Sequence, residues 1–292
     1  MAFLPTLYCS WCCEGGITLK THYHHLSLLP QSSIILEHSG NENPWTIDSH
    51  MFYDDDTKRL WMTWGGHETF ISELDPKTGM LCCTPNCKDG AGVCASPKFT
   101  THAAGVHTKI LSWSRDTNQT PKLVMDGAPF QGDGCGQEYM EGPALWKHEG
   151  KFFALASWGS MGTDYTIRVC RSDTPRGPFL DKGGVDCAKY VNTNSEEGTF
   201  GSSMLFGAED EQSVPGHPHI WKETDSPGLP GVRWYMGYDY RRGAATKSSG
   251  EEGRDYMAVR RLHWIENAPG ANGETCMWGF LTRTVVQLKS FE

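Results

Sequence analysis

Three polar side chains that can transfer protons, Asp48, Glu141 and His217, each open a similar segment of the chain. Each is followed by a short apolar run, a turn and a second run rich in aromatic residues. Two carboxyl groups and an imidazole in one cleft can carry acid–base chemistry, because burial and mutual repulsion move their pKa values apart. Such chemistry requires a fold that brings these distant side chains together.

The three segments predict β-hairpins, since short aromatic runs alternate with turns rich in Gly, Asp and Pro. The paired runs are 48–53 with 59–65, 141–146 with 151–159, and 217–221 with 233–238. Helical periodicity is nearly absent from the chain. Two further runs, 109–113 and 165–170, are candidate outer strands. The sequence therefore predicts an all-β fold.

The spacing of the hairpins favours a β-propeller. Their starts are about 90 and about 75 residues apart, which suits one or two blades of roughly 40–50 residues. A β-sandwich would give similar strands but would not explain the polar residue that opens each hairpin. In a propeller, the innermost strands of all blades begin on one face around a shared axis. We therefore expect Asp48, Glu141 and His217 to surround one central pocket.

Composition excludes several classes of function. The 292 residues carry a formal charge of −9 with His neutral, from 26 Lys and Arg against 35 Asp and Glu. This balance argues against nucleic acid as the main partner, because phosphate binding needs clustered basic residues. No apolar run of about 18 residues predicts a membrane span. We expect a monomer that acts on a neutral, polar molecule and binds neither nucleic acid nor membrane.

The 11 cysteines predict an exported protein with several disulfide bonds. Four of them lie in one Gly- and Pro-containing loop, where we expect one or two local bridges: Cys82, Cys83, Cys87 and Cys94. Zinc binding is the alternative, although the paired Cys-x-x-Cys spacing is absent. A glycosylation sequon at Asn118 fits an extracellular location. The first residues do not form a recognisable signal peptide.

The sequence divides into an N-terminal segment, 1–43, and a predicted propeller domain, 44–292. The segment holds Cys9, Cys12 and Cys13 and a run of histidines at 22–25, which could be drawn as a metal cluster. We favour an irregular surface segment or the product of a misassigned gene start.

Several motifs together resemble glycoside hydrolase family 43, which comprises arabinanases, arabinofuranosidases and β-xylosidases with five-bladed β-propellers. The matching residues are 47–48, 52–56, 64–66, 141–143, 152–157, 171–179, 216–217 and 256–264. They occur in order over about residues 44–266. The resemblance implies an extracellular enzyme that hydrolyses arabinose- or xylose-containing plant polysaccharides or oligosaccharides with inversion of configuration.

The resemblance also implies roles for the three polar residues. Glu141, in Glu-Gly-Pro, matches the general acid, and Asp48 matches the carboxylate that orients this acid and raises its pKa. His217 matches a histidine near the axis, beside a calcium ion or its waters, so a structural calcium is possible while no cofactor is required. In such a mechanism a base activates water opposite the acid, with the two carboxyl groups about 6.5–9.5 Å apart.

The matching general base is not found at its expected place. In the family it is an Asp in an Asp-Pro motif upstream of the orienting Asp, whereas Asp48 is the first Asp in this chain. The upstream carboxylates are Glu14, Glu37 and Glu42, and none opens a recognisable blade. Either much of the first blade is missing, or residues 1–40 replace it. Asp48 could alternatively be the base, with Asp126 or Asp133 as the orienting residue.

His217 and three other side chains are candidates for sugar binding. Trp64 and Trp158 end equivalent inner strands and could stack on sugar faces, although most strand tryptophans belong to the core. Arg254 could bind a sugar hydroxyl, or could lie exposed in a Gly-containing loop. The acidic run 54–56 is predicted to be a solvated turn, since it lacks the spacing of a calcium loop.

The alternative to an enzyme is a non-catalytic carbohydrate-binding propeller, or an inactive truncated homologue without the base. An enzyme must supply a carboxylate that faces Glu141 across the pocket, whereas a binding protein need not.

Overall fold

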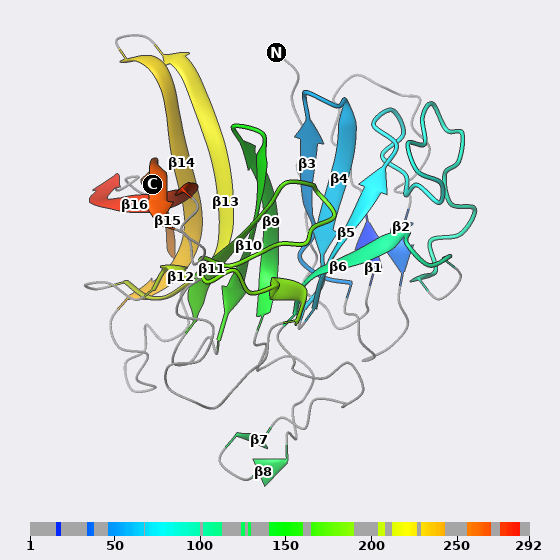
Figure 1. The fold of residues 1–292 in the computed structure, drawn as a ribbon. Coiled ribbons are helices and arrows are strands. Elements are labelled where there is room, and N and C mark those ends of the chain that lie inside the picture. The colour runs from blue at the N-terminus through cyan, green and yellow to red at the C-terminus, as the bar shows by residue number, and fades with distance from the viewer. Residues whose placement is uncertain are drawn as a thin grey trace, which may run out of the picture.

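The computed structural model describes an all-β protein (Figure 1). The described residues are 16–18, 34–37, 46–66, 68–99, 102–112, 124–125, 128–129, 140–159, 165–189, 204–207, 212–226, 229–242, 256–269 and 275–286. These ranges contain three four-stranded antiparallel sheets and two small two-stranded sheets. They also contain a 3₁₀ turn at Cys187–Lys189. No helix within them has the length and apolar character needed to cross a membrane.

In each large sheet the strands follow one another in chain order. The first sheet comprises β3 (His50–Asp54), β4 (Arg59–Trp64), β5 (Glu68–Leu74) and β6 (His107–Ser112). The second comprises β9 (Met140–His148), β10 (Lys151–Trp158), β11 (Thr166–Ser172) and β12 (Met204–Phe206). The third comprises β13 (Gln212–Ser226), β14 (Leu229–Arg242), β15 (Tyr256–Pro269) and β16 (Thr275–Val286). The small sheets pair β1 (Gly16–Thr18) with β2 (Ile34–Glu37), and β7 (Val124–Met125) with β8 (Ala128–Pro129).

All three predicted hairpins are confirmed, as β3–β4, β9–β10 and β13–β14. The run 109–113 falls on β6 as far as residue 112, and the run 165–170 falls largely on β11. The first strands of the sheets are neighbours, since β9 contacts both β3 and β13. The three sheets therefore stand face to face, with their first strands side by side (Figure 1).

The strand β10 shows how the sheets are held together. Phe152 and Ala154 pack into an apolar cluster shared with the first sheet, whereas Phe153 and Leu155 pack into one shared with the third sheet. Successive side chains of a strand point to opposite faces, so both faces of the second sheet are covered. This explains why β10 is apolar almost throughout instead of alternating.

Part of the N-terminal segment belongs to the core, which corrects the expectation of an irregular surface segment. Ile35 and Leu36 on β2 are almost completely buried against Met62 and Trp64 of the first sheet. Burial of these apolar side chains ties β2 to that sheet. The cysteines and histidines that suggested a metal cluster in this segment lie outside the described residues, as does Asn118.

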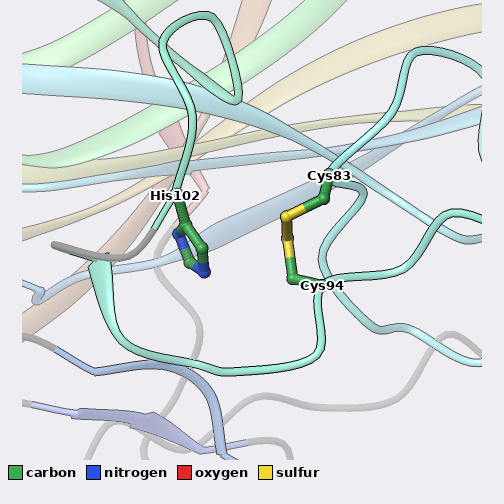
Figure 2. A group of neighbouring side chains, drawn as sticks. All are labelled: Cys83, Cys94 and His102. Atoms are coloured by element: carbon green, nitrogen blue, oxygen red, sulfur yellow. A yellow bond between two sulfur atoms is a disulfide. The ribbon is translucent and has the colours of Figure 1, made fainter.

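The cysteine loop after β5 is closed by two disulfides, Cys82–Cys87 and Cys83–Cys94, which confirms the expected local bridges. Among the described residues, one group of side chains has the spacing of a metal site. The sulfurs of Cys83 and Cys94 lie within 4.8 Å of a His102 ring nitrogen. Figure 2 shows that these two sulfurs are bonded to each other. Zinc requires thiolates, so the zinc alternative for this loop is wrong. A third disulfide, which the sequence did not indicate, joins Cys170 to Cys187.

The acidic turn after β3 is only partly solvated, which corrects the expectation for 54–56. Asp54 is 2% exposed. Its carboxylate accepts hydrogen bonds from the Thr57 hydroxyl and the Asp56 amide. It also accepts one from the ammonium of Lys147, with 2.8 Å between Nζ and Oδ1. Burial alone would raise the pKa of Asp54, but Lys147 and Thr57 together lower it. Because Lys147 lies on β9, this ion pair joins the first and second sheets.

Removal of this ammonium should destabilise the fold. We expect Lys147→Met to lower the free energy of unfolding by roughly 2–3 kcal/mol at pH 7, because Asp54 remains buried without its countercharge. The loss should shrink in acid, because the pKa of Asp54 in the folded chain lies below its ordinary value and the stabilisation by Lys147 is lost as the pH falls through it. Lys151→Met, which removes an exposed partner of Asp173, is the matched control and should cost less than about 1 kcal/mol. Urea unfolding that gives equal losses for both variants would contradict this role.

Candidate active site

The structure brings Asp48, Glu141 and His217 together near the starts of β3 and β9 and at an irregular stretch within β13. The Gly142 amide, next to Glu141, donates a hydrogen bond to Asp48 Oδ2 at 3.0 Å. A Cβ atom on Gly142 would lie 3.0 Å from His217 Cα. Asp48 and His217 both act electrostatically on the Glu141 carboxyl. The expected convergence of the three segments is therefore confirmed.

A left-handed backbone conformation recurs at these three places, with φ of 51° at Asp48, 57° at Gly142 and 50° at His217. The equivalent position in the second sheet is therefore Gly142, one residue after Glu141, and not Glu141 itself. Glycine is required there, since a side chain would collide with His217 and would strain the backbone. Glu141 itself lies within β9, opposite Ser157 of β10 and directly before this bend.

Glu141 is the most strongly perturbed carboxyl group of this site. Its pKa rises from 4.5 to about 7, first because the carboxyl is buried and second because the Asp48 charge repels a second negative charge. A hydrogen bond from the Tyr165 hydroxyl to Oε1 and the charge of His217 oppose this rise. A carboxyl with a pKa near 7 stays partly protonated at neutral pH, so it can donate a proton.

Two further histidines, His50 and His219, interact electrostatically with His217. His50 on β3 accepts the Leu145 amide at Nδ1, over 3.3 Å, and its ring centroid lies 5.1 Å from that of His219. The pKa of His50 falls to about 3, because of burial and then of His219 and His217. Calcium takes roughly six to eight oxygen ligands. The nitrogen-rich surroundings of His217 in the described residues do not fit that ion, and we derive no step through it.

The two tryptophans predicted to bind sugar belong to the core. Trp64 is 0% exposed, stacks on Phe70 with ring centroids 4.9 Å apart, and donates Nε1–H to Ser72 Oγ at 2.9 Å. Trp158 is 3% exposed and packs in the cluster between the first and second sheets. Both rings are covered by protein, so the prediction that they stack on a sugar is wrong. The strands β4 and β10 bury side chains on both of their faces, which the sequence pattern did not indicate.

Several other predicted residues are not part of the described site. Glu37 lies on β2 and pairs with Lys98 through the backbone. Four more fall outside the described residues: Glu14, Glu42, Asp126 and Asp133. Arg254 falls outside them as well. The sequence did not indicate two further residues of the site, Ser157 and Tyr165, because the patterns around them predict only strands.

Comparison with known proteins points to enzymes that cleave arabinan. Arabinan endo-1,5-α-L-arabinosidase B of Emericella nidulans is 28% identical over 186 residues, which are 59% of this chain and 42% of that protein. A probable arabinan endo-1,5-α-L-arabinosidase C of Aspergillus flavus is 27% identical over 144 residues, 46% of this chain and 39% of that protein. The chain thus spans about two fifths of the length of these curated relatives. No protein-family model matches the chain.

Solved structures share the fold. An exo-1,5-α-L-arabinanase from a bovine ruminal metagenomic library superposes with a TM-score of 0.57 at 17% identity, covering 94% of this chain and 72% of that one. Cellvibrio cellulosa α-L-arabinanase, in complex with arabinohexaose, gives 0.54 at 19% identity, covering 91% and 68%. The family 43 glycoside hydrolase YxiA of Bacillus licheniformis gives 0.53 at 18% identity, covering 92% and 53%.

The sequence relatives and the shared fold thus make this chain similar to arabinan-cleaving enzymes and to structures that include a family 43 glycoside hydrolase.

Proposed function

We propose that this chain is a glycoside hydrolase that cleaves arabinan, with Glu141 as the general acid. The observation that carries this proposal is the Glu141 carboxyl, whose pKa of about 7 suits a proton donor at neutral pH. The curated relatives are arabinan endo-1,5-α-L-arabinosidases, and a structural neighbour was solved with arabinohexaose. These likenesses favour α-1,5-linked arabinose over xylan as the substrate class.

Within this proposal Glu141 protonates the glycosidic oxygen, so that the leaving sugar departs as an alcohol. Asp48 keeps the acid protonated, since its charge raises the pKa of Glu141. It is also held beside the acid by the Gly142 amide, which suits an orienting residue better than a base across the sugar. The proposal also requires a base carboxylate on the opposite face of the sugar, to which no described residue is assigned; it would activate water, and attack from that face would invert the anomeric configuration.

The fold and setting are proposed from the same likenesses. The three large sheets would be blades of a five-bladed propeller formed by residues 44–292, with the site at the mouth of the axis. The three disulfides suit an oxidising, extracellular compartment, where a monomer would meet plant cell-wall polysaccharide or oligosaccharide. The raised pKa of Glu141 favours an enzyme over a non-catalytic binding protein, because binding alone does not need a protonated carboxyl.

Replacement of the acid should abolish hydrolysis and leave binding intact. We expect Glu141→Gln to lower the rate on linear α-1,5-arabinan by about 10²–10⁴, since the amide keeps the shape but has no acidic proton. Calorimetric titration with arabino-oligosaccharides should give the same affinity as for the unmodified chain. Glu149→Gln, on the exposed turn between β9 and β10, is the control and should hydrolyse normally. An unchanged rate in Glu141→Gln would remove Glu141 from the mechanism.

The same substitution should stabilise the fold in alkali. Between about pH 4.5 and 7 the folded chain binds more protons at Glu141 than the unfolded chain, so this group lowers stability as the pH rises. Glu141→Gln should therefore raise the free energy of unfolding by on the order of 2 kcal/mol at pH 8 and by little at pH 4. Urea unfolding at both pH values measures the difference, with Glu149→Gln as the reference. A gain of equal size at both pH values would be evidence against the raised pKa.

A further inference from the structure

We propose that Tyr165 is a positioning residue for Glu141, because its hydroxyl occupies Oε1 and thereby leaves the acidic proton on Oε2, the oxygen that no described residue occupies and that would meet the substrate. This inference rests on the proposed role of Glu141 as the general acid. The tyrosine precedes β11 and reaches the acid from the far side of β10, so it is not itself a group that touches the scissile bond.

The hydrogen bonds of the structure lead from the His217 amide toward Glu141. The His217 amide must donate, and it donates to Ser157 Oγ at 2.6 Å. The hydroxyl of Ser157 then uses its own hydrogen toward the Tyr165 oxygen, which lowers the pKa of Tyr165 against the effect of its burial and of Glu141. Tyr165 in turn donates to Glu141 Oε1. Each hydroxyl accepts once and donates once, so the chain is fully satisfied.

The tyrosine ring has little freedom to leave this position. Tyr165 is 4% exposed, Ser157 is 0% exposed, and Ser157 lies opposite Glu141 in the β9–β10 pair. A Cβ atom on Gly216 would lie 2.0 Å from Tyr165 Cε1 and 2.6 Å from Cδ1. Glycine at 216 therefore makes room for the ring, and the third sheet packs against the tyrosine and holds it beside the second sheet.

Two opposed influences on the acid follow from this arrangement. Asp48 favours the protonated form of Glu141, whereas the Tyr165 hydroxyl favours the carboxylate that remains after proton transfer. The phenol also fixes the carboxyl group in one orientation in both states. Tyr165 therefore stabilises the acid as it gives up its proton, while Asp48 ensures that the proton is present beforehand.

Tyr165→Phe tests this inference, because it keeps the ring and removes the donor. We expect kcat on α-1,5-arabinan to fall roughly tenfold with KM nearly unchanged. We also expect the loss of rate in alkali to move to higher pH than in the unmodified chain, since a group that lowers the pKa of Glu141 is gone. Asp48→Asn should move the same limb to lower pH. Tyr53→Phe, on β3, is the control for loss of a tyrosine hydroxyl and should change neither kcat nor the pH profile.

A second measurement does not depend on hydrolysis. The carboxyl carbon of Glu141 can be followed by 13C NMR during a pH titration of the full chain, assigned by comparison with Glu141→Gln. Phenylalanine at 165 should raise the midpoint of this titration, and 3-fluorotyrosine at 165, a stronger donor of the same shape, should lower it. The fluorinated side chain keeps the hydrogen bond, so it also tests the inference if Tyr165→Phe fails to fold.

The outcomes separate the two proposals. An unmodified chain that does not hydrolyse arabinan, but whose Glu141 titration still moves in opposite directions with Phe and 3-fluorotyrosine, would overturn the proposed function and support the contact. Hydrolysis that depends on Glu141, with a titration midpoint that neither side chain at 165 moves, would support the function and overturn the role of Tyr165. A fall in kcat with an unmoved pH profile would likewise mark Tyr165 as a structural residue only.

Discussion

The hydrogen bond from the Gly142 amide to Asp48 Oδ2 is the contact on which the site depends. It joins the starts of β3 and β9, which belong to different sheets and share no strand pairing. It fixes the distance between the two carboxyl groups, because Glu141 is the residue directly before Gly142. The repulsion that keeps Glu141 protonated is thus set by the backbone, and a substrate need not assemble it.

Opposed influences, and not a single strong one, give the acid its pKa. Burial and Asp48 raise it, whereas Tyr165 and His217 lower it, and the result is about 7. These four influences arise from all three large sheets, since Asp48 precedes β3, Tyr165 precedes β11 and His217 lies on β13. The chemistry of one carboxyl group therefore depends on how the sheets pack.

The sequence predicted the hairpins and the convergence of their starts, because short aromatic strands and polar turns leave a local signal. It failed for Trp64 and Trp158, since an inner strand that is buried on both faces looks the same as one that faces a pocket. Asp54 was misjudged because its partner, Lys147, lies on another sheet. Tyr165 was missed for the same reason: its function arises from contacts with Glu141, Ser157 and Gly216, which no local pattern encodes.

The recurrence of one bent conformation at Asp48, Gly142 and His217 has a consequence for how the proposed activity could diversify. These bends lie in or near the first strands of the three large sheets, so the proposed proton donor is supported where these sheets contact one another. Surface connections between strands can then lengthen, shorten or change composition without displacing that donor. Substitutions that change which polymer is bound and substitutions that change bond cleavage would then fall in separate parts of the chain. Each property could vary without loss of the other.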